Sequence, residues 1–268
     1  MKNIRPLKKF GQNYLRDQNI LNKIVNLISP QQTDNIVEIG PGTGALTQKL
    51  VESKCRLTAV EIDRRVIDEL KSEFPSVNFI ENDFLKVELE HLLRQSDDKL
   101  RVVGNIPYNL TSPILFKMIE NNRIVNDSVL MVQYEVAKRM TAKPGVKDYG
   151  ILAVILSFFT IVKLIFRVSP NVFYPKPKVE STVVHLTFKN IEQNQFFQKT
   201  FIKAVKAAFG KRRKMLRNSL SNSIFAEINF SECGIDISKR AEQLSLDDFL
   251  LLTQFVLEKS DLTSDLNK

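Results

Sequence analysis

The first part of the chain alternates short aliphatic runs with stretches of helical spacing. Over about 180 residues, five such runs occur, at 35–39, 56–61, 77–80, 100–103 and 128–133. Short apolar runs bounded by turn residues are typical of buried strands, and the segments between them have the spacing of amphipathic helices. This alternation predicts an α/β fold with a mostly parallel sheet and helices on both of its faces.

Two later runs, at residues 161–168 and 182–188, flank the Pro-rich stretch "SPNVFYPKPKV". They are rich in β-branched residues and close in sequence, which predicts an antiparallel pair at one sheet edge. The longest apolar stretch, residues 151–166, is shorter than the roughly 20 residues of a membrane span. It also contains Ser157, Thr160 and Lys163. We expect a buried helix that runs into a strand.

After Lys189 the pattern becomes entirely helical, through "EQNQFFQKTFIKAVKAAF", "KRRKMLRNSLSNSIF" and "SLDDFLLLTQFVLEK". Ser245 is the predicted N-cap of the last helix, with two acids in its first turn. We therefore expect an α/β domain over residues 1–189 and a small all-helical domain over residues 190–268.

Composition narrows the possible partners. The formal net charge is +9, with an isoelectric point near 9.4. A basic protein usually meets a polyanion, most often nucleic acid, although some basic proteins are merely soluble. Two cysteines far apart and two isolated histidines argue against a metal site, a disulfide framework or a His-based triad. With no secretory segment near Met1, we expect a cytoplasmic protein without a metal.

The stretch "VEIGPGTGALT" places Gly40, Gly42 and Gly44 between a strand and a helix. Glycines there let the backbone turn tightly and approach a ligand. Their spacing is G-x-G-x-G, not the G-x-G-x-x-G of dinucleotide folds. Taken alone, this motif is explained equally well by packing.

The next two strands add acids at the same edge. Glu61 ends one in "AVEID", and Asp83 follows another in "IENDF". Glu61 could accept hydrogen bonds from both ribose hydroxyls of a cofactor, and Asp83 from the amino group of its adenine. Both acids could also be solvated loop residues, but three successive strand ends favour a site. S-adenosylmethionine fits better than NAD because it has no pyrophosphate.

The fourth strand ends in "GNIPYN", residues 104–109. Asn105 offers a neutral acceptor, Ile106 and Pro107 offer backbone carbonyls, and Pro107 stiffens the loop. Such acceptors could hold the amine of a target adenine and aim its lone pair at a methyl donor, which is catalysis by positioning and electrostatics. Tyr108 could stack on the base. An ordinary turn is the alternative, but the place beside the cofactor loop favours catalysis.

These motifs resemble the KsgA-type family of small-subunit ribosomal RNA adenine dimethyltransferases. The shared segments are "FGQNYL", "EIGPGTGALT", "VEID", "ENDFL", "GNIPYN", "YG" at 149–150, "VFYPKPKVES" and "RRKMLRNSL". The resemblance implies a class I methyltransferase domain, a helical RNA-binding domain and S-adenosylmethionine as cofactor. It also implies a monomer that dimethylates N6 of two adjacent adenines near the 3′ end of 16S rRNA in a pre-30S particle.

The same resemblance assigns residues. It puts Asn13 and Leu15 at the methionine end of the cofactor and makes Phe173 a second aromatic face, opposite Tyr108. Without the family, Phe173 would be a buried anchor of the Pro-rich loop. The remaining cofactor positions that it implies are Gly40, Gly42, Glu61, Ile62, Asp83, Phe84 and Asn105.

One position departs from the family. Residue 106 is Ile, where KsgA-type proteins more often have Leu and the related Erm methylases of large-subunit RNA have Ile. An Erm-type methylase is therefore one alternative, although "KDYG" and "GKRRKMLRNSL" favour the small-subunit family. A non-catalytic assembly or transcription factor on the same fold is another, and the intact "NIPY" argues against it.

The helical domain carries a basic run that predicts an RNA-binding helix. Its cations are Lys211, Arg212, Arg213, Lys214 and Arg217. Such runs are often solvated faces, but interleaved Phe209 and Met215 and the overall charge favour RNA. Arg5, Lys8 and Lys9 could extend the same groove. Phosphate contacts of this kind position an RNA without reading its sequence.

Overall fold

The protein is described by a computed structural model covering residues 6–7, 11–95 and 98–265, with side chains as far as residue 259. The chain forms two compact units. Unit 1 comprises residues 1–137 and 161–189, and unit 2 comprises residues 138–160 and 190–268. Residues 138–160, which the sequence pattern placed in the first domain, thus belong with the helical unit. There, Phe158 packs on Phe201 with ring centroids 4.6 Å apart.

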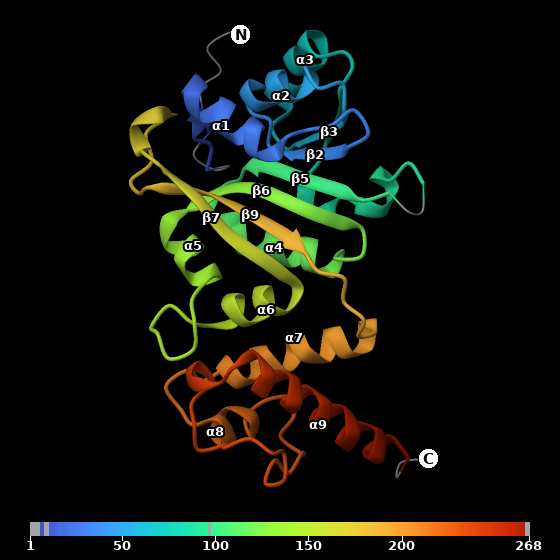
Figure 1. Ribbon diagram of the computed structural model, residues 1–268, viewed down its shortest axis with the longest axis vertical. Helices are drawn as coiled ribbons and strands as arrows, with labels where there is room; N and C mark the ends of the chain where they lie inside the picture. The colour runs from blue at the N-terminus through green and yellow to red at the C-terminus, as the bar shows by residue number, and fades with distance from the viewer. Residues whose placement is uncertain (1–5, 8–10, 96–97, 266–268) are drawn as a thin grey trace. The chain divides into compact units, whose positions relative to one another are not determined.

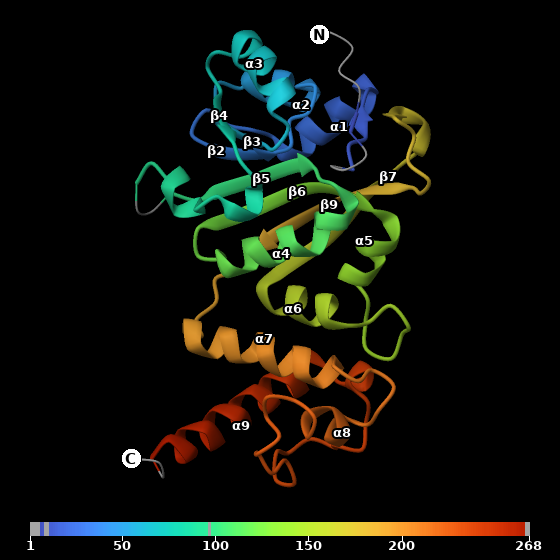
Figure 2. The same cartoon turned by 180° about the vertical axis from the view of Figure 1, so that it is seen from behind.

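Unit 1 is built on a seven-stranded sheet in the order β4-β3-β2-β5-β6-β9-β7 (Figures 1 and 2). The strands are β2 (Asn35–Ile39), β3 (Arg56–Glu61), β4 (Asn78–Glu81), β5 (Leu100–Asn105), β6 (Val125–Gln133), β7 (Thr160–Val168) and β9 (Ser181–Phe188). The pairs among β4, β3, β2, β5 and β6 are parallel, whereas β9 runs antiparallel to β6. The predicted mostly parallel sheet with an antiparallel edge is confirmed.

Helices cover both faces of this sheet. Helix α4 lies in front of it in Figure 2, and α1 lies in front of it in Figure 1. The helices of unit 1 are α1 (Gln18–Ile28), α2 (Ala45–Val51), α3 (Arg64–Glu73), α4 (Thr111–Glu120) and α5 (Tyr134–Met140), whose last residues enter unit 2. In α1 the apolar spacing buries Leu21, Ile24 and Ile28, and Asp17 caps the helix by accepting from the Ile20 N–H at 2.9 Å.

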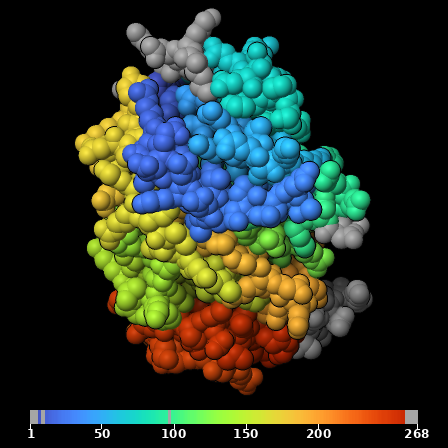
Figure 3. All heavy atoms as spheres, turned by 45° about the horizontal axis from the view of Figure 1, so that its top comes forward, coloured from blue at the N-terminus to red at the C-terminus, as the bar shows by residue number. Residues whose placement is uncertain are grey.

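A second, two-stranded sheet joins distant parts of unit 1. Strand β1 (Tyr14–Leu15) pairs antiparallel with β8 (Phe173–Tyr174), Leu15 opposite Phe173. The Arg16 N–H extends this pairing to the carbonyl of Val172 at 3.0 Å. In Figure 3 the yellow surface near β8 lies beside the dark blue N-terminal surface. Residues 14–16 and residues 172–174 are therefore neighbours, which no local pattern predicts.

Unit 2 is helical. Its elements are α6 (Ile151–Phe159), α7 (Gln195–Phe209), α8 (Leu216–Leu220), η6 (Ala241–Gln243) and α9 (Leu246–Asp265). Phe209 stacks on Phe249 with ring centroids 5.8 Å apart. Ser245 caps α9 as predicted, because its Oγ accepts from the Asp248 N–H at 3.1 Å. The apolar stretch 151–166 forms α6 and most of β7, and no helix in the described ranges is long and apolar enough to span a bilayer.

The predicted basic helix is wrong in its extent. Residues 211–214 form a turn, and only Leu216–Leu220 is α-helical in the segment 211–225. The N–H groups of Leu216 and Arg217 donate to the carbonyls of Lys239 and Ile237, at 2.7 and 3.0 Å, instead of to a preceding helical turn. A helix would also bring like charges into repelling neighbour positions.

Candidate functional site

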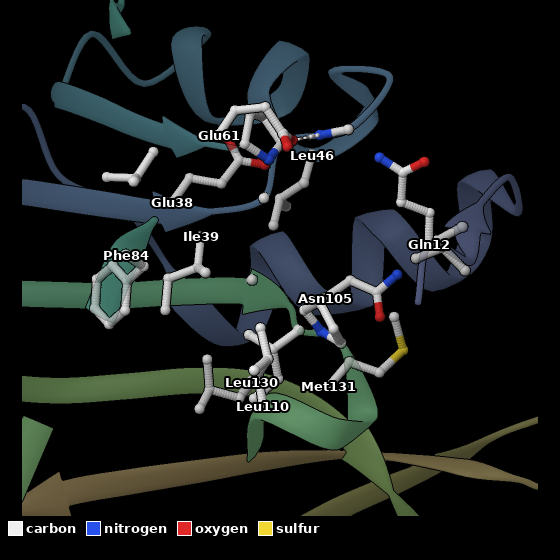
Figure 4. Close-up of a pocket in the computed structure, with 18 of the residues that line it drawn as sticks. Gln12, Glu38, Ile39, Leu46, Glu61, Phe84, Asn105, Leu110, Leu130 and Met131 are labelled. Carbon is white, nitrogen blue, oxygen red and sulfur yellow. Dashed lines mark hydrogen bonds between the residues drawn. The ribbon is translucent and has the colours of Figure 1, made fainter. Parts of the chain in front are cut away.

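A pocket lies where β2, β3, β4 and β5 end. All nine sequence-predicted cofactor residues line it, together with Pro107 and Tyr108. Figure 4 shows Glu61 and Asn105 on opposite sides of this cavity. Carboxyl ends of parallel strands share one sheet edge, and both residues of β1, Tyr14 and Leu15, also line the pocket. The structure thus brings these residues together, while their binding roles stay predictions.

The glycine loop shapes one wall of the pocket. Gly40 and Gly42 have φ values of +63° and +57°, which favour glycine. A Cβ on Gly42 would lie 2.8 Å from the ring of Tyr14, so no larger residue fits there. A Cβ on Gly40 would meet no atom within 4 Å. The backbone at Gly40 therefore faces open space, where a ligand can approach closely.

Glu61 is a buried and fixed carboxylate. It is 4% exposed, and its oxygens accept from the N–H groups of Asp63 at 2.8 Å and Gly42 at 3.1 Å. Burial raises its pKa, and these two hydrogen bonds act in the opposite direction. Glu61 therefore orients the glycine loop, and its carboxylate oxygens keep further lone pairs. Asp83, at the next strand end, caps η2 (Phe84–Lys86) by accepting from the Leu85 N–H at 3.0 Å.

Sequence reasoning missed Glu38. This residue lies inside β2, is 1% exposed, lines the pocket and accepts a 2.7 Å hydrogen bond from the Thr47 hydroxyl. Burial raises the pKa of Glu38 to about 7, and the nearby Glu61 charge adds to that increase. An acid between the apolar residues Val37 and Ile39 was the available sign, because burying a carboxylate costs free energy unless it is hydrogen-bonded or paired.

Glu38 predicts a specific dependence of stability on pH. Its native pKa lies near 7 and its ordinary value is 4.5, so the native state holds more protons than the unfolded state between those values. Stability should therefore fall as pH rises through this window. Glu38→Gln stays neutral at every pH. Its free energy of unfolding should therefore rise relative to that of the parent by an amount on the order of 3 kcal/mol between pH 4.5 and pH 8. Chemical denaturation of both proteins across this range measures the difference. The exposed Glu120→Gln should show no such gain, and equal pH profiles for parent and Glu38→Gln would contradict the assignment.

The "GNIPYN" loop orients its side chains through specific bonds. The Asn105 Nδ2 donates to the carbonyl oxygen of Asn13 at 2.7 Å. This bond directs the amide so that its Oδ1, which has no partner among the described residues, remains available. The Tyr108 hydroxyl is 2.7 Å from the Ser181 Oγ, a contact that the sequence did not suggest. Asn105 therefore presents a free acceptor, and the Tyr108 ring is anchored at its far end.

The two backbone carbonyls of this loop differ. The carbonyl of Pro107 accepts from the Leu110 N–H at 2.9 Å and starts η4 (Tyr108–Leu110). It is therefore not the free acceptor that the sequence suggested, and the carbonyl of Ile106 is the one without a partner in the described part of the chain. The Ile106 side chain is 1% exposed, so the departure from Leu concerns core packing.

Phe173 is a buried residue of the Pro-rich loop. It is 5% exposed, belongs to the hydrophobic core with Leu15 and Val183, and is not among the described residues that line the pocket. The pairing of β8 with β1 holds it there. The structure thus gives Phe173 the packing role, and its role as a second aromatic face stays a prediction.

The predicted RNA-binding cations are all exposed in unit 2, but Arg212 differs from the rest. Its guanidinium bonds to Glu242 at 3.1 Å and donates to the carbonyls of Lys147 and Tyr149. Arg5, Lys8 and Lys9 lie outside the described residues. Within those residues, no group of three or more His, Cys, Asp or Glu side chains could hold a metal ion.

Comparison with known proteins decides the family. The model of the ribosomal RNA adenine dimethylase family matches residues 3–258. The chain belongs to this family. Two relatives are named ribosomal RNA small subunit methyltransferase A. The one from Chlorobium phaeobacteroides strain BS1 is 46% identical over 248 residues, 91% of each chain. The one from Francisella tularensis strain WY96-3418 is 41% identical over 254 residues, 93% of this chain and 97% of the relative.

Solved structures of family members and their relatives share this fold. A dimethyladenosine transferase from Plasmodium falciparum has a TM-score of 0.76 at 27% identity, covering 92% of this chain and 98% of the other. The 23S rRNA methyltransferase ErmE has a TM-score of 0.66 at 22% identity, covering 91% and 99%. The likeness to ErmE shows a common fold alone. The resemblance to the small-subunit family is confirmed.

Proposed function

We propose that this adenine dimethylase transfers methyl groups from S-adenosylmethionine to N6 of two adjacent adenines near the 3′ end of 16S rRNA, two methyls to each. The observation that carries the proposal is Asn105, whose amide is fixed by Asn13 with its acceptor oxygen free at a pocket. The names of the relatives support the small subunit as the substrate.

The lining of the pocket fits S-adenosylmethionine. When bound, this cofactor supplies a methyl group carried on a positively charged sulfur. The open space at Gly40 admits it close to the backbone, and Glu61 offers fixed acceptors for ribose hydroxyls. Asp83 uses one carboxylate oxygen for its cap and keeps the other for the amino group of an adenine. Asn13 and Leu15 would hold the methionine end, and Ile62 and Phe84 would form apolar walls.

The chemistry follows from the acceptors of the "GNIPYN" loop. The exocyclic amine of adenine is a poor nucleophile because its lone pair is delocalised into the ring. The Asn105 Oδ1 and the Ile106 carbonyl would accept its two N–H bonds and favour a pyramidal nitrogen, whose lone pair is then available for reaction. This is catalysis by positioning and preorganised dipoles, and it requires no general base of special pKa.

Tyr108 would hold the target base. Its ring offers a stacking surface worth about 1–3 kcal/mol per base. The bond between its hydroxyl and Ser181 keeps that ring in place. Pro107 stiffens the loop that carries it. Together these residues would keep a base that has left its helix in position for two successive transfers.

The wider proposal concerns the partner. We infer that the substrate is a pre-30S particle, bound by the helical unit as a monomer in the cytoplasm. Lys211, Arg213, Lys214 and Arg217 are exposed and would contact phosphates. Such contacts position an RNA, and the choice of adenine would come from the pocket and the shape of the RNA.

The proposal is tested with the purified protein, tritiated cofactor and small subunits that lack these methyl groups, with large subunits in parallel. Label should enter small-subunit RNA and map to N6 of two adjacent adenines. Label in large-subunit RNA would instead support an Erm-type methylase. No label in either, from protein that binds cofactor, would support a non-catalytic assembly factor.

Glu61→Ala should weaken cofactor binding. The substitution removes the acceptor of two ribose hydroxyls and releases the N–H groups of Gly42 and Asp63. Losing charge-assisted bonds of this kind costs about 1.5–3 kcal/mol, roughly 10- to 150-fold in affinity. Calorimetry with S-adenosylhomocysteine measures the change. Glu81→Ala, an exposed acid outside the pocket, is the control and should bind normally. An unaltered dissociation constant in Glu61→Ala would remove Glu61 from the site.

A further inference from the structure

The loop of residues 141–150 is fastened to the C-terminal part of unit 2. The Gly145 N–H donates to the carbonyl of Glu242 at 2.8 Å, and the Tyr149 hydroxyl donates to the carbonyl of Leu244 at 2.9 Å. The Tyr149 ring also packs against Phe209, with centroids 6.2 Å apart. These contacts hold the loop, which has little regular structure of its own, next to the end of α7.

Arg212 provides the third fastening. Its Nε lies 3.1 Å from the Glu242 carboxylate, and its Nη2 donates to the carbonyls of Lys147 and Tyr149. A guanidinium is suited to this work because its donors are arranged in a rigid fork, whereas a lysine presents a point charge. Arg212 thus uses its side-chain donors to bind the loop and Glu242. This separates it from Lys211, Arg213 and Lys214, which make no such bonds in the described residues.

The fastening brings two cationic segments together. Lys143 and Lys147 on the loop are exposed, and Arg139 just before it is exposed as well. The single acid of the loop, Asp148, lies 3.9 Å from Lys138. Lys143, Lys147, Arg213 and Lys214 form no ion pair within the ranges that the structure describes. Because Arg212 bonds to Lys147 and Tyr149, the cations of the 211–214 turn lie beside those of the loop.

A hollow marks the junction of the two segments. It is lined by Arg139, Lys147 and Arg212 and by the loop residues Asp148, Tyr149 and Gly150, among others. Arg139 and Lys147 are exposed cations at this depression, whereas Arg212 uses its donors on the loop and on Glu242, and such a pair of cations suits a phosphate group. Adenine chemistry at the pocket of unit 1 does not require this feature.

We propose that the loop of residues 141–150 is a second part of the RNA-binding surface, in which Lys143 and Lys147 contact backbone phosphates. Arg212 is the positioning residue that holds this loop against the 211–214 turn. The inference rests on the proposed function for the nature of the polyanion. It goes beyond that function by adding the loop to the surface and by removing Arg212 from the set of phosphate contacts.

The first test measures binding of the protein to unmethylated small subunits at several KCl concentrations. Lys143→Ala/Lys147→Ala should weaken binding about tenfold and lower the log–log salt slope by about 1.4–1.8, two phosphate contacts at about 0.7–0.9 each. Lys71→Ala/Lys163→Ala removes two exposed lysines of unit 1 and should keep the parental slope. A parental slope in the loop variant would overturn the proposal.

The second test distinguishes two roles of Arg212, holding the loop in position or contacting a phosphate. Arg212→Lys keeps the charge but cannot make the fork of bonds, so it should bind subunits as weakly as Arg212→Ala. Glu242→Gln replaces the carboxylate partner of Arg212 with a neutral amide and should also weaken binding, because the loop loosens. Trypsin cleavage after Lys147 should be faster in all three variants. If Arg212→Lys and Glu242→Gln bind subunits like the parent, Arg212 is an ordinary phosphate contact and its assignment falls.

A third variant keeps this inference distinct from the proposed function. Arg213→Ala/Lys214→Ala reports on the turn that the proposed function uses. If Arg213→Ala/Lys214→Ala keeps the parental salt slope and Lys143→Ala/Lys147→Ala lowers it, the loop belongs to the RNA-binding surface and the turn does not. The reverse pattern would show that the turn contacts RNA and would overturn the proposal for the loop. Binding of S-adenosylhomocysteine, which depends on unit 1, should be the same in every variant and shows that unit 1 is intact, and an unchanged far-UV circular dichroism spectrum shows that the helices of unit 2 are folded.

Discussion

Asn105→Ala should slow single-turnover methylation of small subunits by roughly 10²- to 10³-fold, the loss seen when one preorganised oxyanion-hole group is removed. The substitution removes the free Oδ1 acceptor that we propose accepts a hydrogen bond from the target amine. An interaction made chiefly in the transition state lowers the rate of the chemical step. RNA affinity should change little, because phosphate contacts supply most of it. Near-parental rates would make "GNIPYN" an ordinary turn.

The comparison with Tyr108 shows whether the two residues act differently. Tyr108→Ala removes the stacking ring and should impair capture of the base, whereas Tyr108→Phe keeps the ring and should retain near-parental rates. Tyr108→Phe does leave the buried Ser181 hydroxyl without its partner, so Tyr108→Phe/Ser181→Ala is the matched control. If Tyr108→Phe and this double variant are both as slow as Asn105→Ala at saturating cofactor, the hydroxyl has a chemical role.

Arg101→Met should destabilise unit 1 by about 3 kcal/mol, the lower end of the usual effect of breaking a buried ion pair, because Asp127 is buried while Arg101 is partly exposed. Arg101 lies at the start of β5, and its guanidinium contacts Asp127 at 2.8 and 2.9 Å and Asp34 at 2.6 Å. It also donates to the carbonyl of Ile28 at 2.7 Å. Among the described residues, its removal leaves Asp127, which is 6% exposed, with only His185 at 3.1 Å. Thermal unfolding should occur on the order of 10 °C lower.

Two further variants test this interpretation. Arg64→Met breaks an exposed pair with Glu81, 3.8 Å long, and should cost less than about 1 kcal/mol. Arg101→Met/Asp127→Asn removes the isolated buried charge and should recover part of the loss. Because Arg101 and Asn105 lie at opposite ends of β5, methylation well below the melting temperature should persist in Arg101→Met. If Arg101→Met loses no more stability than Arg64→Met, the contacts of Arg101 with Asp127 and Asp34 do not stabilise the sheet.

Local patterns in the sequence determined most of the sheet and one side of the site. Strands β2 and β3 have the bounds that their aliphatic runs predicted, because a strand buried on both faces leaves a continuous apolar run between turn residues. Glu61 and Asp83 could be placed together for a topological reason, since successive parallel strands end at one edge. The same rule predicted the place of the "GNIPYN" loop at that edge. Helix-capping preferences predicted Ser245 as the N-cap of α9.

The tertiary structure decided what depends on contacts between distant segments. The sequence could not reveal that β8 pairs with β1, which buries Phe173, or that Asn13 orients the amide of Asn105. The burial of Glu38, which raises its pKa, also depends on what covers β2. Arg212 stood in a run of four cations that differ little in sequence, and only the approach of residues 147–149 distinguishes it. Periodicity reports which face of an element is buried, whereas a hydrogen bond's partner is set by how the chain folds back on itself, and that information is spread over the whole sequence.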